Sequence, residues 1–388
     1  MLFDGLKPQA PDALLALIGL FAADPRADKI DLGVGVYRDE SGGTPVFRSV
    51  KAAEAKLLQT QASKSYLGPE GDIRFTELLK PIVFGGKIDP KSVVGVQTPG
   101  GTGALRLAAE LIAAAKPGTK VWIGTPTWPN HPPVFASANL TLQTYRYFDQ
   151  ASQTILFDEM IEALSRAEAG DVALLHGCCH NPTGANLTAQ QWDEVAALVA
   201  KRGLIPLVDL AYQGLGAGLE QDAAGLHKVL ESAGDVIVAF SCDKNFGLYR
   251  DRVGALYVRS QQSAQSELVL ANMLALARSN WSMPPDHGAA VVRTILDDAD
   301  LTADWTAELT SMRLRIAEVR QALAAGDSFF APQEKQQGMF SLLPLNPDQV
   351  ATLRKEHGIY MAGSGRANLA GLTLKTVPKF IAAVKSVR

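Results

Sequence analysis

Short runs of β-branched and other apolar residues alternate along the chain with longer stretches rich in alanine and leucine. This alternation predicts strands separated by helices, which is typical of a doubly wound, largely parallel sheet. The stretch from Leu105 to Ala115 has the helical pattern, because Leu107 and Leu111 mark one face and Pro117 follows its end. The predicted strands cover Val93 to Val96, Val121 to Ile123, Val172 to Leu175, Leu204 to Val208, Val236 to Phe240 and Ala255 to Val258.

The pattern changes from Leu301 onward. A long charged helical pattern runs from Trp305 to Leu323, short strands punctuated by glycine follow, and a last helix is expected from Val377 to Val387. The segment before Pro45 carries few strand signals. We therefore expect a large domain over residues 46–300, and a smaller α+β domain built from residues 1–45 together with 301–388.

The apolar stretch from Leu14 to Ala23 has two possible readings, the core of a signal peptide or a helix that faces the protein core. Asp4 and Asp12 precede it and no small-residue cleavage pattern follows, so we expect the helix. No apolar run reaches the length that spans a bilayer, and no membrane partner is expected.

Composition narrows the possible partners. The 388 residues include 37 Lys plus Arg against 40 Asp plus Glu, so no basic stripe is expected and nucleic acid is an unlikely partner. The three cysteines, Cys178, Cys179 and Cys242, are too few for a disulfide framework, which favours a reducing cytoplasm.

Distinctive polar residues follow five of the predicted strands. In open α/β sheets, ligands bind in the crevice at the carboxyl ends of the strands, so these segments should meet at one rim and form a site. The segments are Thr98 to Gly103, Thr125 to His131, His176 to Gly184, Asp209 to Tyr212, and Ser241 with Lys244 and Arg252.

Each of these features also has a purely structural explanation. Gly100 to Gly103 could form only a tight turn, Asp209 could cap a turn, Lys244 could extend to water, and Trp128 could serve packing. Together, however, a glycine-rich phosphate cradle, an arginine, an aromatic ring, a carboxylate and a lysine are the parts that bind a phosphorylated pyridine aldehyde.

Four segments carry a family resemblance: HGCCHNPTGANLT, PLVDLAYQGLGAG, SCDKNFGLYRDRVG and SGRANLAG. They resemble the class I (fold type I) aminotransferases, specifically the aspartate and aromatic amino acid aminotransferases. The resemblance extends from LGVGVYRDESGGTPV near the start to SGRANLAGL near the end. It implies a pyridoxal phosphate (PLP) enzyme with the fold of a fold type I PLP-dependent transferase. That fold is α/β, with a mostly parallel seven-stranded sheet in the large domain, a smaller α+β domain, and a homodimer with shared active sites.

The resemblance assigns roles around the cofactor ring. Lys244 matches the lysine that forms a Schiff base with the cofactor and acts as general base. Asp209 would keep the pyridine nitrogen protonated, so that the ring becomes an electron sink, and His131 would support Asp209 from behind. Trp128 would stack on the ring.

Further residues would bind the other parts of the cofactor. Tyr212 and Asn181 would hydrogen-bond the 3-oxygen of the ring, and Tyr212 completes the expected catalytic set of Lys244, Asp209 and Trp128. The phosphate would be held by Gly101, Thr102, Ser241 and Arg252, and by Tyr66 from the other subunit.

The substrate contacts follow from the same resemblance. Arg366 would bind the α-carboxylate through two parallel hydrogen bonds, with Gly35, Trp128 and Asn181 lining the same site. Arg278 matches the arginine that crosses from the other subunit to bind a side-chain carboxylate. The implied reaction is ping-pong transamination between an aromatic or dicarboxylic L-amino acid (Tyr, Phe, Asp, Glu) and 2-oxoglutarate or oxaloacetate, without a metal ion.

Two positions depart from the family pattern. Asp243 stands where the family commonly has a serine next to the lysine, and its carboxylate could alter the field near Lys244 or simply face away. Met283 replaces an asparagine common in aspartate-directed members, which favours apolar substrates. With the Tyr-Arg-Tyr-Phe segment at residues 145–148, this indicates dual use of aromatic and dicarboxylic amino acids, and a strict aspartate aminotransferase is the alternative.

Other functional classes fit less well. A nicotinamide-dependent dehydrogenase would need a glycine fingerprint after its first strand, which is missing here. A non-catalytic regulator on this fold would need a DNA-binding module or a basic surface. A lyase or decarboxylase could use the same Lys244 and Asp209, but Arg278 favours dicarboxylate transamination.

Overall fold

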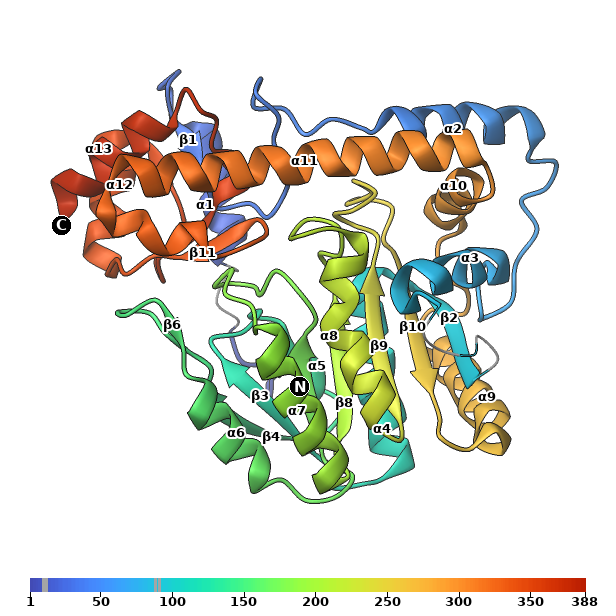
Figure 1. Ribbon diagram of the computed structural model, residues 1–388. Coiled ribbons are helices and arrows are strands. Elements are labelled where there is room, and N and C mark those ends of the chain that lie inside the picture. Colours follow the sequence, from blue (N-terminus) through green and yellow to red (C-terminus); the bar gives the residue numbers. More distant parts are fainter. Residues whose placement is uncertain (9–12, 87–88, 90–91) are drawn as a thin grey trace.

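The computed structural model describes residues 1–8, 13–86, 89 and 92–388 and is built around one seven-stranded sheet (Figure 1). The strand order is β2-β10-β9-β8-β7-β3-β4. Only β10 runs antiparallel to its neighbours, and the other pairings in the sheet are parallel. The predicted α/β class with a mostly parallel seven-stranded sheet is therefore confirmed. The strands are β2 (Val93–Pro99), β3 (Lys120–Thr125), β4 (Thr141–Arg146), β7 (Val172–His176), β8 (Ile205–Leu210), β9 (Val236–Ser241) and β10 (Val253–Arg259).

Alternate residues of each strand pack against helices on opposite faces of the sheet. In β9, Val238 and Phe240 belong to one core cluster, whereas Ile237 and Ala239 belong to the other. Because side chains alternate across a strand, a run that is apolar at every position marks a strand buried on both faces. The helices of this part of the chain are α3 (Ile73–Phe84), α4 (Gly100–Ala115), α5 (His131–Ala136), α6 (Phe157–Ser165), α7 (Ala189–Arg202), α8 (Leu219–Ser232), α9 (Ser263–Asn280) and α10 (Asp286–Leu296), and a short hairpin joins β5 (Phe148–Asp149) to β6 (Thr154–Ile155).

The long helix α11 (Ala299–Gly326) runs from α2 (Arg48–Thr60) to the C-terminal helices (Figure 1). It contains the helix predicted from Trp305 to Leu323, and the last helix, α13 (Val377–Val387), has the predicted bounds. A separate core cluster joins Ile30 and Leu32 to residues of the C-terminal segment such as Leu353 and Phe380. The elements of this segment are η2 (Ser328–Glu334), β11 (Phe340–Leu342), α12 (Pro347–His357), β12 (Ile359–Tyr360), β13 (Arg366–Asn368), η3 (Leu369–Gly371) and α13 (Val377–Val387).

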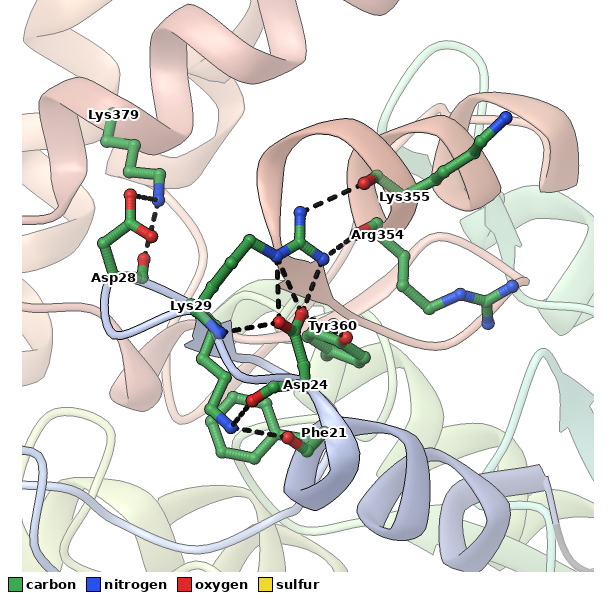
Figure 2. Close-up of polar contacts among 9 residues, drawn as sticks. Phe21, Asp24, Asp28, Lys29, Arg354, Lys355, Tyr360 and Lys379 are labelled. Carbon is green, nitrogen blue, oxygen red and sulfur yellow. Dashed lines mark hydrogen bonds and ion pairs between the residues drawn. The ribbon is translucent and has the colours of Figure 1, made fainter.

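The N-terminal segment is fastened to the C-terminal one by paired backbone and by side chains (Figure 2). Strand β1 (Ile30–Asp31) pairs in parallel with β12. Arg26 donates from Nη1 to the carbonyl of Lys355 and from Nη2 to that of Arg354, each at 3.0 Å, so it satisfies carbonyls at the end of α12. Asp24 binds Arg26 and accepts a hydrogen bond from the Tyr360 hydroxyl at 2.6 Å.

Helix α1 (Ala13–Ala23) forms where the apolar stretch predicts a helix, and the side chains of Leu14 and Leu15 lie outside the described ones. Among its described side chains only Leu17 is buried, whereas Ile18 is 44% and Leu20 48% exposed. The described side chains therefore do not form a core-facing stripe. The helix meets the rest of the chain through Leu17, which lies against Gly33, and through Phe21, whose ring contacts that of Tyr360. None of the described helices is long and apolar enough to cross a membrane.

Candidate active site

Lys244 lies in the loop that follows β9 and lines a cavity at the carboxyl ends of the strands. Its side chain is 18% exposed, and its Nζ lies 5.1 Å from the centroid of the Tyr212 ring. Burial lowers the pKa of Lys244, and the positive charges of Arg252 and Arg366 act in the same direction, against the carboxylates of Asp243 and Asp209. A lowered pKa increases the fraction of free amine, which is the nucleophilic form.

Asp209, at the carboxyl end of β8, is held by a chain of buried hydrogen bonds. Its Oδ2 lies 2.9 Å from His131 Nε2, Thr127 Oγ1 lies 2.7 Å from His131 Nδ1, and His176 Nε2 lies 3.0 Å from the same hydroxyl. Burial lowers the pKa of His176 to about 3, so this ring is neutral. Since a carboxylate only accepts, His131 Nε2 donates to Asp209, Thr127 donates to His131 Nδ1 when that ring is neutral, and His176 donates to Thr127.

The chain of hydrogen bonds through His131, Thr127 and His176 keeps the Asp209 carboxylate ionised. Burial alone would raise the pKa of Asp209, but the hydrogen bond from His131, helped by the positive charge of Lys244, outweighs it and holds the pKa below its ordinary value. His131 occupies Oδ2, and within the described part of the chain no group donates to Oδ1. Asp209 therefore offers the cavity a negative charge and a free acceptor.

A second polar group joins Asn181 and Tyr212, which line the cavity, to Arg366. Asn181 donates from Nδ2 to the Tyr212 hydroxyl at 3.3 Å and accepts from Arg366 Nε at 3.3 Å. Arg366 also donates to the Gly33 carbonyl at 3.2 Å, and its guanidinium lies 4.1 Å from the centroid of the Phe340 ring. Burial lowers the pKa of Arg366, and burial raises that of Tyr212.

Arg366 is thus a buried cation whose described partners include no carboxylate. A buried charge without a counter-charge is costly, so the arrangement suits an anionic ligand. Gly35 lies beside it, because a Cβ on Gly35 would stand 3.5 Å from Arg366 Nη2 and 3.0 Å from the Phe340 ring. A side chain at position 35 would therefore occupy the space beside the Arg366 guanidinium that the ligand needs.

The amino end of α4 forms a cradle with the end of β9. Gly100 has a φ of +69°, and a Cβ there would stand 2.5 Å from Arg252 Nη2. A Cβ on Gly101 would stand 3.0 Å from the Ser241 side chain. The glycines therefore allow Arg252, Ser241 and the first amides of α4 to approach one point, which is the arrangement that binds a phosphate.

The structure brings together most of the predicted site residues in one chain. The cavity is lined by Gly101, Thr102, Trp128, Asn181, Asp209, Tyr212, Ser241, Asp243 and Lys244, among others. The Trp128 ring stands edge-on to His131, with ring centroids 5.2 Å apart. Asp243 lines the cavity, so of the two possibilities left open by the sequence, it faces inward.

Tyr66 and Arg278 are not brought to the cavity of their own chain. Tyr66 is 94% exposed, and Arg278, on the exposed side of α9, hydrogen-bonds Ser282. Their segments are neighbours, because the Leu67 amide contacts the Met283 sulfur at 3.0 Å. Their expected contribution to a second subunit stays a prediction.

Three further residues were not singled out from the sequence. Thr127 links His131 to His176, Phe340 supports Arg366, and the Tyr249 carbonyl accepts from Arg252 Nη1 at 2.9 Å. Thr127 lies within a polar segment already expected at the rim of the sheet. No local sequence pattern marks Phe340 as a site residue, because its ring contacts Arg366 only once distant segments have packed together.

Known proteins resemble this chain over its whole length. The family model "Aminotransferase class I and II" matches residues 27–384. A tyrosine aminotransferase of Rhizobium meliloti (strain 1021) is 57% identical over 376 residues, which is 96% of each chain. An aspartate aminotransferase of Escherichia coli (strain K12) is 44% identical and both chains are fully covered. The solved aromatic-amino-acid aminotransferase of Burkholderia pseudomallei, described as covalently bound to pyridoxal phosphate, superposes with a TM-score of 0.96 at 36% identity, covering 100% of this chain and 99% of that one.

Proposed function

Because the chain belongs to the class I and II aminotransferases, which use pyridoxal phosphate, we propose that it transaminates both aromatic and dicarboxylic L-amino acids. The amino group would pass to 2-oxoglutarate or oxaloacetate in a ping-pong cycle. The observation that carries this proposal is the convergence of Lys244, Asp209 and Asn181 around one cavity, with Arg366 hydrogen-bonded to Asn181. Relatives named for tyrosine and for aspartate support the range of substrates.

The residues present fit pyridoxal phosphate. Asp209 offers a free carboxylate oxygen for a protonated ring nitrogen, and the Gly100 and Gly101 cradle with Ser241 and Arg252 offers donors for a phosphate. Thr102 would add its amide and hydroxyl to that cradle. The bound cofactor supplies an electron sink for the substrate carbon that carries the amino group.

Lys244 would hold the cofactor covalently and move the substrate proton. Its lowered pKa favours the free amine, which would accept the proton from the substrate Cα and deliver it to the cofactor carbon bonded to the substrate nitrogen. A positioned general base of this kind contributes roughly 10²–10⁴-fold to a rate. Tyr212 and Asn181 would orient the ring oxygen, and Trp128 would cover the ring face.

Arg366 would bind the α-carboxylate that every amino acid substrate has. Its fixed contacts with Asn181, Gly33 and Phe340 pre-orient the guanidinium, so little conformational freedom is lost when the carboxylate arrives. Gly35 keeps the approach open, and Asn181 and Trp128 complete the walls. These contacts would hold the substrate so that Lys244 can reach its Cα–H bond.

We also propose a homodimer in which Tyr66 and Arg278 complete the site of the partner subunit. Both are exposed and lie away from the cavity of their own chain. Apolar side chains at the N-terminus, Leu2, Phe3 and Leu6, are also exposed, as expected of a surface that a partner covers. Sedimentation of the purified protein tests the assembly, and a monomer that is fully active would contradict it.

The organisation and location of the protein complete the proposal. The large domain would span residues 46–300, and residues 1–45 with 301–388 would form the small domain, as the shared core of Ile30, Leu353 and Phe380 suggests. The three cysteines are free and buried, which is compatible with a reducing cytoplasm.

The decisive experiment combines a spectrum with two assays. The purified protein should absorb visible light through bound cofactor, lose that band when glutamate is added, and transaminate both tyrosine and aspartate. Lys244→Ala should abolish the band shift and turnover, whereas Lys201→Ala, on the exposed face of α7, should change neither. A protein that stays colourless with added pyridoxal phosphate would refute the proposal.

Substrate range is tested by Arg278→Ala. Loss of a desolvated charge pair of about 2–5 kcal/mol should lower kcat/KM for aspartate by roughly 30-fold or more. Phenylalanine should be affected much less, because its ring makes no use of the charge. Activity with aspartate alone in the unaltered protein would instead indicate a strict aspartate aminotransferase.

A further inference from the structure

A carboxylate stands inside the cradle that should bind the phosphate. Asp243 is 6% exposed, and its Oδ2 accepts from Arg252 Nη1 at 2.7 Å. Its Oδ1 is buried and has no hydrogen-bond partner among the described residues. An orphaned buried carboxylate oxygen is unusual, because it loses its water and gains nothing in exchange.

The surroundings of Asp243 place this oxygen at the amino end of α4. A Cβ on Gly100 would stand 3.4 Å from Oδ1. From its own loop, Lys244 Nζ lies 3.9 Å from Oδ2, and Ser241 Oγ accepts from the Asp243 amide at 3.2 Å. Arg252, from the loop before β10, is the other cation that meets the carboxylate.

We propose that Asp243 weakens the hold of this site on the phosphate of its cofactor, and so sets how readily the cofactor is released. This inference rests on the proposed roles of the cradle residues. Asp243 neutralises Arg252, the cation expected to bind the phosphate. The free Oδ1 of Asp243 also places a negative charge beside the doubly charged phosphate. Since both anions are withdrawn from water, salt screens their repulsion poorly.

Asp243 also orients Arg252, and this orientation would strengthen phosphate binding. That orientation does not depend on Asp243 alone, since the Tyr249 carbonyl accepts from the same Arg252 nitrogen at 2.9 Å. The Gly100 backbone also lies close to the guanidinium, because a Cβ on Gly100 would stand 2.5 Å from Arg252 Nη2. Removal of the carboxylate therefore leaves Arg252 in place with its charge uncompensated, and the repulsion decides the sign.

The effect should matter most when the cofactor carries the amino group. In that form it has no covalent link to Lys244, so the phosphate contacts become its main attachment. A weakened cradle then allows exchange with free cofactor between the two halves of the reaction. The same property makes the enzyme sensitive to the concentration of free cofactor.

The test measures binding of pyridoxamine phosphate to the full-length protein after its cofactor has been dialysed away. Calorimetric titration compares the unaltered chain with Asp243→Ser and with the isosteric Asp243→Asn. Both variants should bind pyridoxamine phosphate about tenfold more tightly, which corresponds to 1.4 kcal/mol. Both should also bind inorganic phosphate more tightly.

Two controls separate this effect from others. Pyridoxamine, which lacks the phosphate, should bind all three proteins with dissociation constants within about twofold of each other, equivalent to less than 0.5 kcal/mol. The variant Asp251→Asn removes a negative charge from the residue next to Arg252. The Cβ of Asp251 lies against Gly288 in α10, so this variant should leave pyridoxamine phosphate binding unchanged.

Several outcomes would overturn the inference. Equal or weaker binding of pyridoxamine phosphate by both Asp243 variants would mean that orientation outweighs repulsion. Equal tightening for pyridoxamine would mean that Asp243 acts through Lys244 and not through the phosphate. If the unaltered protein neither binds pyridoxamine phosphate nor transaminates, the proposed function fails. If it does both and the variants bind identically, only the inference fails.

Discussion

The cavity is lined by two carboxylates, Asp209 at the end proposed for the cofactor ring and Asp243 at the end proposed for its phosphate, and their partners give them opposite consequences. Asp209 is backed by His131, and its free oxygen would meet a protonated ring nitrogen. Asp243 is backed by Arg252, and its free oxygen would meet a phosphate. The same chemical group would therefore stabilise the ligand at one end and destabilise it at the other. The charge that a buried group will face, and not its burial, decides its contribution.

The largest effect should come from removing the carboxylate at the ring end. Asp209→Ala should lower kcat by on the order of 10²–10³-fold, as loss of a preorganised electrostatic contact does, while the cofactor stays bound through Lys244 and the cradle. Single-turnover absorbance with glutamate measures this. Asp243→Ser, assayed at saturating cofactor, should retain most of its turnover. Comparable losses in the two variants would erase the contrast between the ends.

An intermediate effect is expected at the phosphate end when Arg252 is replaced. Arg252→Ala should weaken pyridoxamine phosphate binding by roughly 30-fold, because a charge-assisted contact of about 2 kcal/mol is lost and Asp243 is left unopposed. The double variant Arg252→Ala/Asp243→Ser should recover part of that loss. A double-mutant cycle by calorimetry gives the coupling between them. Additive effects would show that the two side chains act independently.

The smallest effect should come from the far end of the hydrogen-bond chain behind Asp209. Thr127→Val removes the hydroxyl that joins His131 to His176 at nearly constant volume. The loss of one buried hydrogen bond, about 1 kcal/mol, should lower kcat roughly fivefold. Thr127→Ser keeps the hydroxyl and should restore the rate. A valine variant with full activity would show that His131 alone keeps Asp209 ionised.

Much of the fold follows from local pattern. Six strands lie where apolar runs predict them, because a strand buried on both faces is apolar at nearly every position. Strand β4 was missed, since it lies at the edge of the sheet and its residues Thr141, Gln143 and Arg146 are polar. The described side chains of helix α1 do not face the core as expected, because an apolar sequence does not say whether the chain itself or a partner covers it.

The site residues that could be predicted from the sequence are those in the polar segments that directly follow the predicted strands. Lys244, Asp209 and the glycine cradle follow strands of one sheet and so had to converge. The Phe340 ring beneath Arg366 and the Tyr249 carbonyl behind Arg252 were not predictable, because their positions depend on packing between distant segments. The direction of Asp243 was also open in the sequence, since a loop residue can turn either way.

The pairing of β1 with β12 has a consequence for how the chain is made. Ile30 emerges from the ribosome early, but its partner Ile359 emerges only near the end of synthesis. All strands of the seven-stranded sheet lie between Val93 and Arg259, so that sheet can assemble while the C-terminal segment is still being translated. The core around Leu32 and Phe380, and the contacts of Arg26 with α12, must wait for the last residues. A nascent chain released early would therefore expose the unpaired β1 segment, which is a surface that chaperones and proteases recognise.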